Sequence, residues 1–241
     1  MLGTILFAVG LALIVSRATK WTLFAQTCST IGALAIVGGV SYLSGGDMYV
    51  NYSLAAGLAV AAGVAASGLL AALSVLQFSV ALGSGTEYWH ASYGLWVERP
   101  ALSIGVLAVV AVGLLLVSTR VPSLYERVCL IASRTTVVMI NLAFLVGSLF
   151  GDQMLGWPAA WFTKAWGILL VGVGIWGVYA NRRWVVNAAA VFGAIHFYTQ
   201  WFEYLGPNPF SVLGGGALLI VFGLLLRWIN TRVNRPMPVA A

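Results

Sequence analysis

One run of polar residues near the end of the chain is spaced to lie along a single face of a helix. His196, Thr199, Gln200 and Glu203 stand at positions i, i+3, i+4 and i+7, and side chains at these intervals share one side of an α-helix. An imidazole and a carboxylate in one row can bind a polar ligand or pass a proton, because histidine changes its charge near neutral pH. The spacing predicts either a polar site or a set of hydrogen bonds between helices.

Four further residues carry groups that bind cations or polar ligands. Asp47 follows two glycines, Asp152 follows a third, and Glu87 and His90 stand three residues apart in a segment rich in aromatic residues. Carboxylates near imidazoles are ligands for divalent cations. None of these residues has the spacing of a known metal motif, so we predict no metal site. Asp47 and Asp152 join His196 as candidates for a polar site, and Glu87 and His90 are weaker candidates.

The motifs of common enzymes are missing from the sequence. It has no P-loop, no Gly-x-Ser-x-Gly elbow, no His-Glu-x-x-His pair and no Cys-x-x-Cys. Its two histidines do not favour a bis-histidine haem. These absences favour a protein that is not an enzyme and has no cofactor, although an intramembrane acid and base remain a third hypothesis.

Composition identifies the class of elements that must hold these residues. Apolar residues make up 61% of the 241 positions and charged residues only 7%, and the mean hydropathy is +0.97. A soluble domain has charges at roughly a quarter of its positions. Lipid is the solvent that fits, and because lipid offers the backbone no hydrogen-bond partner, the apolar runs are expected to be helices. We predict one all-α, polytopic transmembrane domain over residues 1–241, with no soluble domain.

The apolar runs predict a bundle of eight or nine transmembrane helices. The expected spans lie near Leu2–Ser16, Trp21–Leu43, Ser53–Gly83, Ala101–Ser118, Thr135–Phe150, Ala165–Tyr179, Trp184–Phe202 and Phe210–Ile229. The third has 31 residues, and as a single helix it would be about 45 Å long, beyond the roughly 30 Å of bilayer hydrocarbon. It is either one strongly tilted helix or a tight hairpin that turns near Ser67-Gly68.

The positions of basic residues predict the orientation, because short cytoplasmic loops collect Lys and Arg. Three alternate connections or ends hold most of them: Arg120, Arg127 and Arg134; Arg182 and Arg183; and Arg227, Arg232 and Arg235. This pattern predicts a cytoplasmic C-terminus, with Asp152, Glu203 and the Thr86–Pro100 loop outside. Placing Arg17 and Lys20 inside as well requires nine spans and an outer N-terminus, which we favour. Eight spans would leave both residues outside.

Small and sulfur-containing residues are expected to serve packing. Glycine and alanine repeat at helical spacing around Gly57, Gly63, Gly172 and Gly214–Gly216, and such faces let membrane helices approach closely. Cys28 and Cys129 have no metal spacing. The net charge of +6 is explained by loops that face anionic lipid, and no basic stripe interleaved with aromatic residues predicts a nucleic-acid partner.

Two stretches carry a resemblance to a known family. The run Tyr42-Leu43-Ser44-Gly45-Gly46-Asp47, and the stretch from Arg182-Arg183-Trp184 through Asn187, His196, Phe202 and Gly214–Gly216 to Arg227, resemble a family of predicted bacterial polytopic membrane proteins catalogued as a domain of unknown function. The likeness is clearest over the last sixty residues. It implies a protein of the bacterial cytoplasmic membrane with no assigned activity.

Two classes of function follow from these features. The first is a carrier or channel for a small solute, an ion or a lipid, with the face of His196, Gln200 and Glu203 opening toward the outer side. The second is a non-catalytic accessory or assembly subunit, because glycine- and alanine-rich faces pack well against other subunits or a second copy of the chain. In both, the lipid bilayer is the main partner.

Overall fold

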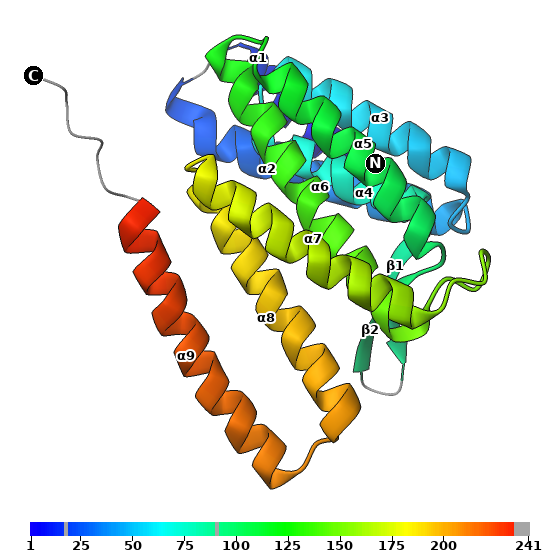
Figure 1. The fold of residues 1–241 in the computed structure, drawn as a ribbon. Helices are drawn as coiled ribbons and strands as arrows, with labels where there is room; N and C mark the ends of the chain where they lie inside the picture. Colours follow the sequence, from blue (N-terminus) through cyan, green and yellow to red (C-terminus); the bar gives the residue numbers. More distant parts are fainter. Residues whose placement is uncertain (17–18, 90–91, 234–241) are drawn as a thin grey trace, which may run out of the picture. The chain divides into compact units, whose positions relative to one another are not determined.

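The fold was analysed in a computed structural model, which describes residues 1–16, 19–89 and 92–233. Within these residues the chain forms a short 3₁₀ turn (Thr19–Trp21), nine α-helices and one β-hairpin. The elements in chain order are α1 (Leu2–Val15), α2 (Thr22–Leu43), α3 (Met48–Ala65), α4 (Gly68–Ala81), β1 (Ser84–Trp89), β2 (Ser92–Val97), α5 (Pro100–Ser118), α6 (Ser123–Phe150), α7 (Ala159–Tyr179), α8 (Arg183–Leu205) and α9 (Pro209–Val233) (Figure 1). The prediction of a helical chain is confirmed.

Six of the described helices are long and apolar enough to cross a membrane: α2, α3, α5, α6, α7 and α9. These helices indicate a multi-pass membrane protein. Helices α1 and α4 are apolar but have only 14 residues each, so each is about 21 Å long, shorter than the roughly 30 Å hydrocarbon layer. Helix α8 has 23 residues and carries the polar stripe. The count of eight or nine crossings stays a prediction.

The chain divides into two compact units, residues Met1–Trp157 and Pro158–Ala241. Unit 1 contains α1 to α6 and the hairpin, and unit 2 contains α7, α8 and α9. Each unit is described below by itself.

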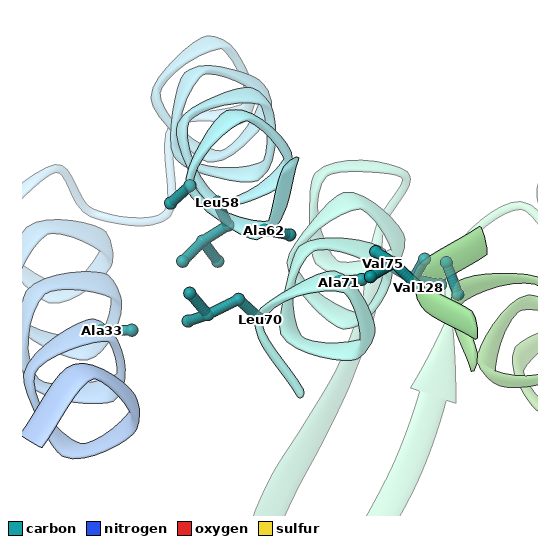
Figure 2. Close-up of a cluster of buried hydrophobic side chains, with 9 residues drawn as sticks. Ala33, Leu58, Ala62, Leu70, Ala71, Val75 and Val128 are labelled. Atoms are coloured by element: carbon teal, nitrogen blue, oxygen red, sulfur yellow. The ribbon is translucent and has the colours of Figure 1, made fainter. Parts of the chain in front are cut away.

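Helix α4 lies at the centre of the core of unit 1 (Figure 2). Its Leu70 side chain is fully buried and points toward α3 and α2, where it meets Leu58 and Ala33. Five residues further along, Val75 faces Val128 of α6. The short α4 is therefore enclosed by longer helices.

The predicted long span at residues 53–83 is a pair of helices, so the hairpin alternative is confirmed and the single tilted helix is wrong. Helix α3 ends where Ala66 takes a left-handed conformation with φ of 47°. Ser67 then begins α4, since its side chain accepts a hydrogen bond from the Leu70 amide. The hydroxyl of Ser74 donates to the carbonyl of Ala55 over 3.0 Å and joins the two helices.

Glycine allows backbone contact between α1 and α2. A Cβ on Gly32 would lie 2.4 Å from the Phe7 nitrogen, and one on Gly10 would lie 2.5 Å from the Ser29 nitrogen. Both obstacles are backbone atoms, so no side-chain rotation could make room. The close packing expected at Gly57 and Gly63 is absent, because added Cβ atoms there would meet nothing within 4 Å.

A β-hairpin replaces part of the loop expected at residues 86–100. Strands β1 and β2 pair antiparallel, with Ser84 opposite Val97 and Thr86 opposite Leu95. Aromatic and β-branched residues in this segment favour strands. Val97 anchors the hairpin, because it packs with Ala143 and Val146 of α6.

Unit 2 is built on α8, which packs between α7 and α9. Gly177 of α7 lies against Val185 and Val186 of α8, whereas an added Cβ on Gly172, where close packing was also expected, would meet nothing within 4 Å. On the other side, the indole nitrogen of Trp201 donates to the Ser211 carbonyl over 3.0 Å at the start of α9. These contacts join α8 to α7 on one side and to α9 on the other.

Candidate functional site

The polar stripe on α8 does not form one site, because its members face different neighbours. His196 packs on α7: its ring meets the buried Trp166 edge-on with centroids 4.8 Å apart. A Cβ on Gly167 would lie 3.1 Å from the His196 Nε2 atom, so the small residue on α7 makes room for the imidazole. Within the described residues, the Nδ1 atom of His196 and the Nε2 atom of Gln200 are buried without a hydrogen-bond partner.

Thr199 and Glu203 line a groove that is formed by α8 and by Leu219 of α9. This groove has a volume of about 720 Å³, and its lining is mostly apolar: Val191, Ala194, Ile195, Tyr198, Phe202 and Leu219, beside Thr199 and Glu203. The Thr199 hydroxyl donates to the Ile195 carbonyl of its own helix over 2.8 Å. Among the described residues on the wall of this groove, the exposed Glu203 is the only charged one.

The aromatic wall of this groove is held in place from both helices. The Tyr198 hydroxyl donates to the Gly215 carbonyl on α9. The rings of Tyr198 and Phe202 are stacked, with centroids 6.3 Å apart and planes 29° apart. Gly215 leaves little room to spare, because a Cβ there would lie 3.0 Å from the Tyr198 ring.

The two candidate aspartates stabilise helix and loop backbones. Asp47 caps α3, where its carboxylate accepts from the Val50 amide over 3.0 Å. Asp152 is only 2% exposed, and one of its oxygens accepts from the Ala101 amide in the first turn of α5. Its other oxygen accepts from the amides of Met154 and Leu155. Each carboxylate thus serves a different helix terminus.

The weaker candidates give no site geometry. The backbone of Glu87 belongs to β1, its side chain is not described, and His90 lies outside the described residues. No group of three or more His, Cys, Asp or Glu residues that could hold a metal ion occurs in the described part of the chain.

A polar network inside unit 1 was missed by the sequence analysis. The Nε2 atom of Gln77 on α4 donates to the Oδ1 atom of Asn51 on α3 over 2.8 Å. The Ser41 hydroxyl on α2 donates to the same oxygen over 2.7 Å, and the Asn51 amide donates to the Gly46 carbonyl. The available signal was the amide side chain of Gln77 inside the expected run Ser53–Gly83, with Asn51 two residues before that run.

An apolar cavity of about 470 Å³ was also missed. Helices α3, α4, α5 and α6 line it, chiefly with small side chains: Tyr52, Ala55, Ala56, Ala59, Ala62, Gly63, Ala71, Ser74, Val75, Phe78, Val110, Leu114, Tyr125, Val128, Cys129 and Ala132. Its volume falls in the range of about 300–1,000 Å³ that is usual for small-molecule sites. Gly63, one of the small residues for which close helix packing was predicted, lies on the wall of this cavity instead.

Comparison of the chain with protein-family models, with curated proteins and with solved structures finds no match. The resemblance of the C-terminal residues to a bacterial membrane-protein family stays a prediction.

Proposed function

We propose that this chain is a multi-pass membrane protein that carries a lipid, and that it binds the acyl chain of that lipid in the alanine-lined cavity of unit 1. The observation that carries the proposal is the cavity itself, because its volume and apolar wall suit a lipophilic ligand. This narrows the carrier hypothesis from a small solute, an ion or a lipid to a lipid.

The shape of the cavity favours a linear ligand. Its lining residues on α3 extend from Tyr52 to Gly63, a rise of about 16 Å along the helix. The described wall offers few polar groups, and the Ser74 hydroxyl is already engaged by the Ala55 carbonyl. An acyl chain needs no hydrogen bonds and gains free energy from burial of its methylene groups, so it fits this wall better than a polar solute does.

The cavity is open toward the surroundings of unit 1. Ala56 and Ala59 belong to its wall and are also exposed. In a membrane the surroundings of an apolar helix such as α3 are lipid, so an acyl chain can enter sideways without crossing water. This path does not require the polar stripe on α8.

The proposal is tested by filling the cavity near its opening. We would reconstitute the wild type and the Ala59→Phe variant in nanodiscs and count retained lipids by native mass spectrometry. Val60→Phe is the matched control, because Val60 is the next residue on α3, is 68% exposed and is not on the cavity wall. We expect Ala59→Phe to retain one lipid fewer than the wild type and Val60→Phe. Equal retention by all three proteins would contradict the proposal.

We further propose that the membrane is a bacterial cytoplasmic membrane and that the C-terminus is cytoplasmic. Single cysteines at Thr119 and Gln153, placed in a chain without Cys28 and Cys129, test the orientation. Both positions are exposed and lie in the connections at opposite ends of α6. A membrane-impermeant maleimide added to intact cells should label Gln153→Cys, and it should label Thr119→Cys only after permeabilisation. The reverse pattern would overturn the orientation.

A second candidate is an accessory or assembly subunit. The observation that favours it is the exposure of unit 2, where only 17% of the apolar stretch of α7 and 11% of that of α9 are buried within the chain. Another subunit, or a second copy, could cover these faces. Gentle extraction from the native membrane and mass spectrometry of the intact particle would show stoichiometric subunits. A monomer that carries only lipid would exclude this candidate.

A further inference from the structure

We propose that the groove beside α8 and α9 binds a phospholipid with an ammonium headgroup, with Glu203 as the counter-ion and the rings of Tyr198 and Phe202 as the wall beside the cation. The site belongs to unit 2 and is separate from the acyl-chain cavity of unit 1. It would add headgroup selection to the proposed function.

Charge is the first argument for a cation. Glu203 is the only acidic residue in positions 158–241, and it forms no ion pair with any described residue. It lies two residues before the end of α8 at Leu205. The last carbonyl groups of a helix carry partial negative charge, so the helix end and the carboxylate attract a cation together.

No basic side chain among the described residues of unit 2 lies on the wall of the groove. Arg182 and Arg183 lie at the opposite terminus of α8, and Arg227 lies toward the C-terminal end of α9. Lys164, near the start of α7, lies at the same end of the antiparallel α7–α8 pair as Glu203, but it is exposed and is not on the wall of the groove. A ligand in the groove therefore meets the Glu203 carboxylate and none of the described basic side chains.

The stacked aromatic pair is the second argument. Ammonium groups are attracted to the faces of aromatic rings within about 6 Å. Tyr198 is held by its hydrogen bond to the Gly215 carbonyl, and Phe202 is stacked on it. This arrangement places two ordered rings on the same wall as the Glu203 carboxylate, so little side-chain ordering is needed on binding.

The apolar part of the groove selects a lipid over a small soluble cation. From Glu203 the lining continues to Val191, twelve positions or about 18 Å along the helix. Ile195 and Leu219 line this stretch, and Leu219 is 53% exposed. An acyl chain that lies along these side chains would keep the headgroup beside Glu203.

The test measures which headgroup the protein retains. The wild type and the variants Glu203→Gln and Glu126→Gln are reconstituted in nanodiscs with equal amounts of phosphatidylethanolamine and phosphatidylglycerol, and retained lipids are identified by native mass spectrometry. Glu126→Gln is the matched control, because Glu126 is exposed, lies on α6 of unit 1 and carries the same charge. We expect the wild type and the control to prefer phosphatidylethanolamine, and the preference to fall about tenfold in Glu203→Gln.

Several results would overturn the proposal. One is the same headgroup preference in Glu203→Gln as in the control, and another is no preference in the wild type. A third is Glu203-dependent binding of dodecyltrimethylammonium without retention of phosphatidylethanolamine, which would assign the groove to free amphiphilic cations. Phe202→Leu should weaken the preference, because it removes an aromatic face and leaves an apolar side chain in its place. Failure of the cavity proposal is distinguishable, because Ala59→Phe changes the number of lipids and Glu203→Gln changes their headgroup.

Discussion

The side-chain amide of Gln77 donates a hydrogen bond to the side-chain oxygen of Asn51 over 2.8 Å, between two helices that meet in the interior of unit 1. The two residues are 5% and 1% exposed. The Ser41 hydroxyl donates to the same oxygen, so α2, α3 and α4 are joined at one acceptor. A buried polar group in such surroundings is costly unless it is paired.

Replacing Gln77 by leucine should lower the free energy of unfolding by about 1 kcal/mol, because the Asn51 oxygen loses one of its donors. The measurement is thermal or denaturant unfolding in detergent. Gln26→Leu is the matched control, since Gln26 is exposed on α2. A Gln77→Leu protein as stable as the control would show that the network contributes little.

Replacing Gly32 by alanine should separate α1 from α2. The new Cβ would lie 2.4 Å from the Phe7 nitrogen, and overpacking of this kind costs about 1–3 kcal/mol. Gly38→Ala on the same helix is the control, because nothing lies within 4 Å of its Cβ position. We expect a lower melting temperature for the first variant only. Equal melting temperatures would mean that α1 and α2 are not in backbone contact.

Replacing Asp152 by alanine should release the start of α5 and the following turn. Three amides, those of Ala101, Met154 and Leu155, would lose their acceptor, at a cost of about 3 kcal/mol or more. Hydrogen exchange at Ala101 should accelerate. Asp47→Ala should cost only about 1 kcal/mol, as the loss of an exposed helix cap does. Unchanged exchange at Ala101 would refute this role for Asp152.

Cys129 should react with a small apolar thiol reagent before Cys28 does. Cys129 is on the wall of the apolar cavity and is partly exposed, whereas Cys28 is only 6% exposed. Labelling with N-phenylmaleimide, read by mass spectrometry, gives the order. The Ala59→Phe substitution should slow the labelling of Cys129, because it narrows the same cavity. Faster labelling of Cys28 would contradict the assigned burial.

The helices could be predicted from the sequence because their apolar runs are long and local. The boundary of α6 could not, since its first turns from Ser123 carry Glu126 and Arg127 and are not apolar enough to be counted in a span. The hairpin at residues 84–97 was interpreted as part of a loop. Its aromatic residues favour strands, but the contact of Val97 with α6, which anchors the hairpin, cannot be predicted from the local sequence.

The candidate site was predicted in part. Helical spacing indicated correctly that His196 and Glu203 are on α8, but spacing does not show which neighbour each side chain meets. His196 contacts Trp166 of α7, whereas Glu203 lines the groove beside α9. Asn51 and Gln77 are 26 positions apart, and no local pattern shows that two such residues will meet.

The helices of unit 1 differ twofold in length, from 14 residues in α1 and α4 to 28 in α6. The hydrocarbon layer has one local thickness. Near a short helix the bilayer must thin or the chain must shift, and a long helix must tilt or project beyond the layer. Such mismatch costs fractions of a kcal/mol per Å. The stability of this protein should therefore vary with the acyl-chain length of the host membrane. Bilayer thickness would then influence in which membranes the protein resides.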